Sequence, residues 1–520
     1  MEVLFKNKKI LGYIILVLIT ILGIFVFIPA IQKPIPPGVD AVTYINDVNW
    51  IFQNETLPDP YQPTYHSFLA YPSQGTDINL FVWSVITGLN VVYPLFNIYQ
   101  IFLIILLIVS SYLVGGLYSR LVAILFPLAL IGSFSIIRLF IGSTISNLLA
   151  FSFVNIIFYC VFQYVVCKNK RMAPLTIIIL FSLLITHGYL TAPIFIATFF
   201  IFLFFLFFIN RDTRIETVAI IKRIHWFVLI SSLLIFLFFL VYLFFYYRDL
   251  FIEALNSFLR PSQNEKFREV IRFKQYGSYL GPFLFQIGTL GLLLYLARWK
   301  KNLLSFRVLP LLWIGMLALL LQTYRFGVDF FFERLIFLSG VFFALFAAYG
   351  VDALIKLRRI TYSPVVFFII AFFIVLVVSG GANQVQTLYA SSNKVQSDHI
   401  QALKIVQTKT TIENQIFSNE NAVSQTLHDV MIADRDFIYL KIGKTHCPQA
   451  DAACYAFNEP NRENSINFFR ENSINFFLLI KPSVDGDALV NDLSKVYQDS
   501  KLYDTLFLSP NVGLFKLNSN

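Results

Sequence analysis

The chain has 520 residues, of which 57% are hydrophobic and 58 are Phe, and its formal net charge is +10. Its repeated apolar runs of about 20 residues match the length that a membrane-spanning helix needs, so we predict an integral membrane protein and exclude a soluble one. The basic excess lies in short loops before residue 381. Because it forms no single basic patch, nucleic acid is excluded as a partner.

About eleven membrane spans are predicted from these apolar runs. They lie near residues 10–30, 97–117, 120–136, 144–166, 173–188, 190–209, 225–247, 279–297, 303–323, 335–355 and 362–380. The first has a basic lead but no convincing cleavage site, which indicates a retained anchor. The basic loops are 1–9, 168–171, 211–223, 298–307 and 356–359. The positive-inside rule makes them cytoplasmic and puts the C-terminal tail outside a prokaryotic cytoplasmic membrane.

The first predicted outer loop, residues 31–95, is too long to be a plain connector. Residues 40–54 place Val42, Ile45, Val48 and Phe52 at helical spacing, with Asp40, Thr43 and Asp47 on another face. A second amphipathic stretch begins at Asp77. Both are predicted to be interfacial helices.

A second outer loop, residues 248–278, is basic although it is predicted to be exported. Arg272 and Lys274 belong to it. Such a loop beside lipid favours attraction to phosphate head groups. The alternative is a solvated face balanced by the loop's own acidic residues.

The end of the chain is predicted to be a polar linker, 381–397, followed by a small extracytoplasmic α/β domain, 398–520. Helices are expected at 398–411 and 487–499, and strands at 416–417, 437–440, 476–480 and 512–517. The octapeptide RENSINFF occurs at 462–469 and again at 470–477, and we expect the duplication to lengthen a helix before the strand. Cys447 and Cys454 form a disulfide in an exported tail or remain two thiols.

Isolated polar residues gather at the predicted outer ends of the spans. They are Arg138, His187, Tyr324, Arg325, Glu333 and Arg334. Ionisable groups at membrane depth are costly and usually face a cavity or a partner. A phosphate or an acidic side chain would suit Arg138 equally well. His187 is a supporting residue of a site or a hydrogen-bonded helix end, and Glu333 with Arg334 is part of a site or a plain ion pair.

Asp40, which follows Pro36-Pro37-Gly38-Val39, has two interpretations of equal standing. An Asp just before an amphipathic helix is a good N-cap. A carboxylate on an outer loop can also act as a general base. Asp47 is a possible second carboxylate or a solvated helix residue.

Several segments in the expected order make the chain resemble the GT-C superfamily of polytopic glycosyltransferases, which includes protein mannosyltransferases. They are GVDAVTYINDVNWI, YPSQGTDINLFVWSVITGL, LFIGSTISNLLAF, THGYLTAP, FFERLIFLSGVFFALFAAYGVDAL and YDTLFLSPNVGLFKL. The resemblance implies an all-α polytopic domain, 1–380, followed by the small α/β domain. Together these segments cover nearly the whole chain, although each is loose.

The resemblance implies an inverting glycosyltransferase that uses a polyprenyl-phosphate sugar donor at the outer face of the membrane. Carried onto this chain, the base is Asp40, with Asp47 as a second catalytic carboxylate. The donor phosphate needs positive charge, for which Arg138, Arg325, Arg334, Arg272 and Lys274 are the candidates, with His187, Tyr324 and Glu333 in support.

The chain departs from two relatives within that superfamily. Ala41 follows Asp40 where protein mannosyltransferases carry an Asp-Glu pair, and the WWDYG signature of oligosaccharyltransferases is absent. Both activities are therefore disfavoured, and the acceptor (glycan, lipid or protein) stays open. Some members use a divalent cation such as Mg²⁺ or Mn²⁺, but no ligand set here requires one. The alternative functions are a transporter or flippase of lipid-linked saccharide and a non-catalytic membrane protein with a binding tail.

Overall fold

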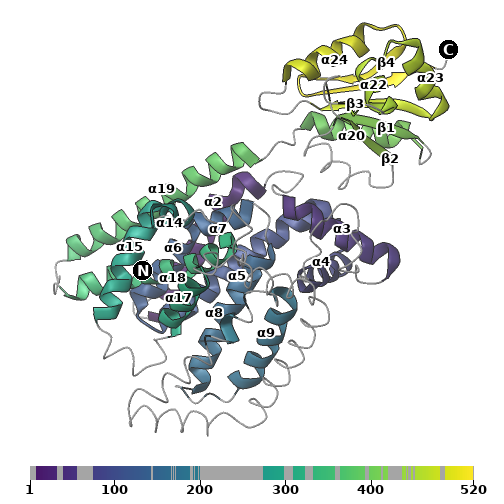
Figure 1. Ribbon diagram of the computed structural model, residues 1–520. Coiled ribbons are helices and arrows are strands. Elements are labelled where there is room, and N and C mark those ends of the chain that lie inside the picture. The colour runs from purple at the N-terminus through teal and green to yellow at the C-terminus, as the bar shows by residue number, and fades with distance from the viewer. Residues whose placement is uncertain are drawn as a thin grey trace, which may run out of the picture. The chain divides into compact units, whose positions relative to one another are not determined.

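The structure is a computed structural model, shown in Figure 1. It describes residues 8–31, 39–55, 74–141, 145–165, 167, 169, 171–187, 191, 194–196, 198, 273–297, 309–321, 332–357, 363–392, 397–411, 414–419, 436–440, 442, 447–448, 451–480 and 487–518. The span predicted at 225–247 lies outside these residues, and most of the span predicted at 190–209 does too. The described residues form two compact units.

The first unit is helical and holds all the candidate spans. Its elements are α2 (Lys8–Ile31), α4 (Gln74–Thr87), the π-helix η1 (Val91–Leu95), α5 (Phe96–Gly116), α6 (Arg120–Ile131), α7 (Phe134–Ile141), α8 (Ile145–Val165), α9 (Met172–His187), α14 (Phe273–Leu280), α15 (Pro282–Ala297), α17 (Leu309–Leu320), α18 (Phe332–Leu357) and α19 (Ser363–Ser392). The second unit begins at Ala390 and also includes α3 (Val39–Asn54), from the first predicted outer loop.

Five of the described helices are long and apolar enough to cross a membrane: α2, α5, α8, α18 and α19. Helices α9, α15 and α17 are apolar but shorter. Together with the small C-terminal sheet, these helices confirm a mostly helical membrane protein. The number of eleven spans stays a prediction.

The span predicted at 120–136 is not a single helix. Helices α6 and α7 meet at Gly132 and Ser133 with a bend of 48°. Helix α19 crosses at this point, and a Cβ at position 132 would clash with Val377 of α19. Glycine is therefore required here by a close approach of two backbones. The consequence is that the chain turns at the break and continues as α7, which carries Arg138.

Helix α19 also differs from its predicted end at residue 380. It continues to Ser392 and so occupies most of the segment that was expected to be a linker. Gly381 does not end the helix, because it packs against Gly132, whose Cα would lie 2.9 Å from a Cβ at position 381. No Pro interrupts residues 382–392, and Val385 in that stretch is fully buried.

Helices α8 and α9 pack side by side, as Figure 1 shows. Helices α5, α8, α15 and α18 begin at the end where α6 and α9 finish. We call this the α4 end, because α4 leads into α5 there through η1. The exposed basic residues Arg120, Arg171 and Lys356 belong to the opposite end, as the alternation of basic loops predicts, whereas the half-buried Arg138 lies at the α4 end. Which end faces the cytoplasm stays a prediction.

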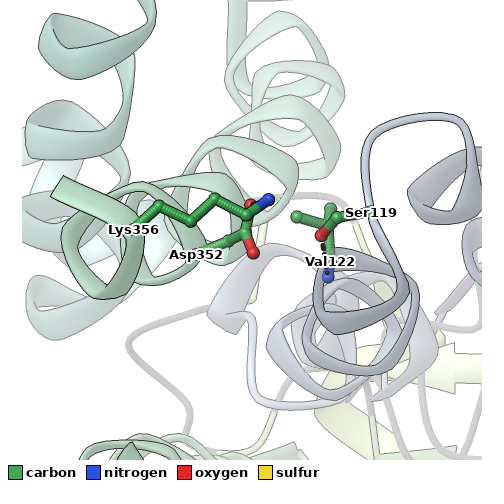
Figure 2. Close-up of polar contacts among 4 residues, drawn as sticks. All are labelled: Ser119, Val122, Asp352 and Lys356. Carbon is green, nitrogen blue, oxygen red and sulfur yellow. Dashed lines mark hydrogen bonds and ion pairs between the residues drawn. The ribbon is translucent and has the colours of Figure 1, made fainter. Parts of the chain in front are cut away.

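Figure 2 shows two of the polar contacts at that opposite end. The Ser119 hydroxyl caps α6 by accepting a hydrogen bond from the Val122 backbone N–H at 3.1 Å. Lys356 Nζ lies 2.6 Å from a carboxylate oxygen of Asp352, one turn earlier on α18. The Lys356 side chain is 53% exposed, so the pair adds little stability.

The C-terminal part of the second unit is an α/β domain built on one mixed sheet. Its elements are α20 (Ser397–Lys409), β1 (Gln415–Asn419), β2 (Asp436–Leu440), α22 (Ala452–Asn458), α23 (Glu463–Glu471), β3 (Ile474–Ile480), α24 (Asp487–Asp499), β4 (Tyr503–Leu508) and β5 (Val512–Leu517). The strand order is β2-β1-β3-β5-β4. Strands β1, β2 and β3 run parallel, and β5 pairs antiparallel with β3 and β4.

The sheet buries an aromatic core beneath α22, α23 and α24 that includes Phe417, Phe457, Phe477, Tyr497 and Phe515. The predicted helices and the four predicted strands are confirmed, whereas β4 was not predicted. Cys447 and Cys454 are joined in a disulfide, with 5.5 Å between their Cα atoms. A disulfide persists in an oxidising compartment.

The two copies of RENSINFF adopt different structures. The first copy forms most of α23, and the second copy adds the last two residues of that helix, Arg470 and Glu471, before a turn and β3. The prediction of a helix that spans the duplication and precedes the strand is therefore confirmed. Ser473 has φ +56° and ends the turn, and the apolar run that follows it pairs with β1 and β5. The last Phe of each copy, Phe469 and Phe477, is fully buried, and the two rings pack at 4.8 Å.

Equivalent serines in the two copies should respond oppositely to the same substitution. Ser473→Gly should stabilise the tail by about 1 kcal/mol, because a left-handed backbone costs a non-glycine residue about that much. Ser465→Gly, within α23, should destabilise it by about 0.5 kcal/mol. Hydrogen exchange of the β3 amides in the full chain measures both. Equal signs would contradict the helix-and-strand assignment.

Candidate functional site

Arg138 is the predicted site residue that the structure describes most fully. It lies near the end of α7, half-buried, between the fully buried neighbours Ile137 and Leu139. Its Nε atom is buried and makes no hydrogen bond. The guanidinium instead lies over the ring of Tyr279, 4.9 Å from the ring centroid. No acidic side chain pairs with Arg138 among the described residues.

Tyr279 belongs to a junction of three helices at the α4 end. The Ser135 hydroxyl of α7 donates to the Tyr279 carbonyl of α14 at 3.1 Å. The Tyr279 ring meets Phe337 of α18 edge to face, with centroids 6.0 Å apart. We call Ser135, Arg138, Tyr279 and Phe337 the three-helix junction. Gly281, with φ +93°, ends α14 against the Phe134 ring.

Three other predicted site residues lie on helices of this junction. Lys274 is in α14, and Glu333 and Arg334 are in the first turn of α18. Their side chains are outside the described part of the chain. Arg272, Tyr324 and Arg325 lie outside it entirely. The fold thus brings together the helices that carry Arg138, Lys274 and Arg334.

Asp40 and Asp47 both belong to α3, as predicted. Asp40 is the second residue of the helix, and Asp47 is half-buried. Seven residues make nearly two turns, so the two positions share one side of α3, roughly 10 Å apart along the axis. The Asp40 side chain is outside the described residues, and its choice between cap and base stays open.

The apolar face of α3 differs in detail from the predicted one. The structure buries Ala41, Tyr44, Ile45, Val48 and Ile51. Phe52, expected on that face, is 48% exposed. The buried residues follow spacings of three and four, whereas Phe52 falls beside Ile51 at the edge of that stripe.

His187 is the last residue of α9 and is fully buried. Its Nδ1 accepts a hydrogen bond from the Thr191 backbone N–H at 3.3 Å. The Thr191 hydroxyl lies 2.6 Å from the same nitrogen. An Nδ1 that accepts places the imidazole proton on Nε2 and leaves the ring neutral. In this geometry His187 is a hydrogen-bonded helix end that ties Thr191 to α9.

Asp77 is a candidate that sequence reasoning did not select. It lies in the first turn of α4 and is only 3% exposed. On the same helix, Trp83 packs on Tyr99 of α5 with ring centroids 6.4 Å apart. In the sequence, Asp77 stands at the start of an amphipathic stretch, which is typical of an ordinary helix start and does not indicate a buried carboxylate. Its burial follows from the packing of α4 against α9 and η1.

Within the described part of the chain, no three His, Cys, Asp or Glu side chains come close enough to hold a metal ion. Asp77 belongs to the first unit, whereas Asp47 belongs to the second.

Comparison with known proteins identifies the fold. No family model matches the chain, and no curated protein matches it. The Archaeoglobus fulgidus oligosaccharyltransferase, tethered with an acceptor peptide, is similar over 91% of this chain and 69% of its own, with TM-score 0.56 and 12% identity. Its apo form gives TM-score 0.56, 12% identity and coverages of 91% and 70%.

A third similar structure is ArnT from Cupriavidus metallidurans bound to undecaprenyl phosphate. The similarity covers 98% of both chains at 12% identity, but its TM-score is 0.49. The fold assignment therefore rests on the oligosaccharyltransferase. At 12% identity that similarity establishes the fold alone. The chain therefore has the fold of this oligosaccharyltransferase, which is a GT-C polytopic membrane glycosyltransferase.

Replacing His187 tests its place at the end of α9. His187→Ala should destabilise the protein by about 1–3 kcal/mol, because it leaves the buried N–H and hydroxyl of Thr191 without their acceptor. The melting temperature of the full chain in detergent measures the loss. Ser182→Ala, on an exposed face of the same helix, is the control and should change little. Equal melting temperatures for the two variants would contradict the assignment.

Proposed function

We propose that this chain is an inverting glycosyltransferase that moves a sugar from a polyprenyl-phosphate-linked donor to an acceptor at the outer face of the membrane. The GT-C fold supports transfer of this general kind. The observation that carries the proposal is the guanidinium of Arg138, half-buried at the α4 end without an acidic partner among the described residues.

A phosphate leaving group explains why such a cation would be kept in the membrane part of the protein. When the bond between the sugar C1 and the phosphate oxygen breaks, its electron pair stays on the phosphate. That charge needs a cation rather than a proton donor. A guanidinium can hold two phosphate oxygens at once and keeps its charge at any physiological pH. Lys274 and Arg334, on helices of the same junction, are the further candidates, with Arg272 and Arg325 from the neighbouring segments.

The acceptor hydroxyl needs a base, for which we propose Asp40. Its carboxylate takes the proton as the hydroxyl oxygen attacks C1 from the side opposite the phosphate, which inverts the anomeric centre. Asp47 shares that side of α3 and would act as the second carboxylate. Asp77, buried in the first turn of α4, is a further candidate for holding the acceptor.

The similarity to the oligosaccharyltransferase does not carry its acceptor to this chain. The WWDYG signature is absent from the sequence. Similarity of fold leaves the activity to be argued from the site, and the residues that support this proposal are the candidates for the donor phosphate. The sugar and the acceptor are therefore to be found by experiment. Purified protein incubated with membranes and a panel of radiolabelled polyprenyl-phosphate sugars identifies both from the product.

Replacing the proposed base should abolish transfer and leave the fold intact. Asp40→Asn keeps the size of the side chain and removes its basicity, so the transfer rate should fall by about 100- to 10,000-fold. Asp47→Asn is the comparison on the same helix. The assay is transfer from the labelled donor, with melting temperature as the check on folding. Wild-type activity of Asp40→Asn would remove Asp40 from the mechanism.

Removing the cation should weaken donor binding. Charged hydrogen bonds contribute about 1.5–3 kcal/mol, so Arg138→Gln should raise KM for the donor by roughly 10- to 150-fold. Arg120→Gln, an exposed arginine at the opposite end of the bundle, is the matched control and should leave KM unchanged. An unchanged KM for Arg138→Gln would exclude Arg138 from the phosphate site.

A further inference from the structure

We infer that Tyr279 is a positioning residue that holds the Arg138 guanidinium ready for the donor phosphate. The inference rests on the proposed function and deepens it. It adds a residue that sequence reasoning did not select, because Tyr279 lies far from Arg138 in the chain. Its role follows from contacts that only the fold creates.

The ring of Tyr279 holds a cation without cancelling its charge. A carboxylate would bind Arg138 more tightly, but it would also neutralise the guanidinium and compete with an incoming phosphate. An aromatic face attracts the guanidinium through its quadrupole and carries no net charge. Because the guanidinium lies 4.9 Å from the ring centroid, its full positive charge stays available to a ligand.

Tyr279 can position Arg138 because one contact holds its backbone and another holds its ring. The Ser135 hydroxyl of α7 binds the Tyr279 carbonyl, so α14 is tied to the helix that carries Arg138. Phe337 of α18 packs edge to face on the ring. The buried Nε of Arg138 makes no hydrogen bond, which leaves the ring as the described group that orients this side chain.

A purely structural role for Tyr279 predicts different behaviour. If the ring only fills space, its removal should lower stability and weaken all ligands alike, whatever residue stands at 138. If the ring acts through Arg138, its removal should weaken phosphate ligands only. The loss should also disappear once Arg138 has been replaced, because effects that share one partner are not additive.

A double-mutant cycle on the full chain in detergent separates the two roles. The probe is farnesyl phosphate, and farnesol is the uncharged counterpart. The variants are Tyr279→Leu, Arg138→Gln and the double replacement. Tyr279→Phe keeps the ring. Tyr276→Leu is the matched control, since Tyr276 lies on the same helix and stacks on Phe285 instead.

Tyr279→Leu should weaken farnesyl phosphate binding by about 2- to 30-fold, the range expected for a lost cation–π contact. Farnesol binding should not change. Tyr279→Phe and Tyr276→Leu should bind farnesyl phosphate like the wild type, and Tyr279→Leu should add nothing to Arg138→Gln.

Three results overturn the inference alone, provided that the wild type binds farnesyl phosphate through Arg138. The first is wild-type binding by Tyr279→Leu. The second is an equal loss of farnesol binding in Tyr279→Leu, and the third is an equal loss of farnesyl phosphate binding when Tyr279→Leu is added to Arg138→Gln. Failure of the wild type to prefer farnesyl phosphate over farnesol overturns the proposed function and this inference together.

Discussion

The close approach of α6 and α19 at Gly132 and Gly381 is the constraint on which the candidate site depends. Neither position can accept a side chain without a shift of backbone. The crossing coincides with the 48° break between α6 and α7. Were α6 to continue straight, residues 134–141 would not meet α14, and Arg138 would not reach Tyr279. A contact between two glycines thus decides where a charged residue lies in an apolar bundle.

The way in which Arg138 is held explains how a cation can persist at this depth. An isolated charge away from water is costly, and proteins usually pair it with an opposite charge. For Arg138, the aromatic face of Tyr279 and partial exposure of the side chain take the place of an acidic partner. The arrangement keeps the guanidinium poised for an anion, whereas an ion pair would have to break first. It also explains why no neighbouring acidic residue in sequence accompanies Arg138.

Sequence periodicity predicted the apolar helices, α3, α4 and most strands, because these depend on local patterns of burial. It did not predict the break at Gly132, since the cause is a helix more than two hundred residues later. For the same reason Arg138 was recognised as unusual, but its partner Tyr279 was not. Asp77 was overlooked because an Asp that starts an amphipathic helix is common, and only the packing of α4 against α9 shows that it is buried. The α3 stripe was misplaced by one residue at Phe52.

The two copies of RENSINFF show how a duplication can be accommodated without damage to a sheet. Deleting either copy gives the same shorter polypeptide, in which the strand would follow Pro460 and Asn461 after only a short turn. With both copies present, the copy at 462–469 supplies most of an amphipathic helix. Its last residue, Phe469, packs against the equivalent residue of the other copy, Phe477 in β3. A single duplication could therefore have created both rings of this hydrophobic contact. The inserted segment would then carry the side chain that packs it onto the sheet.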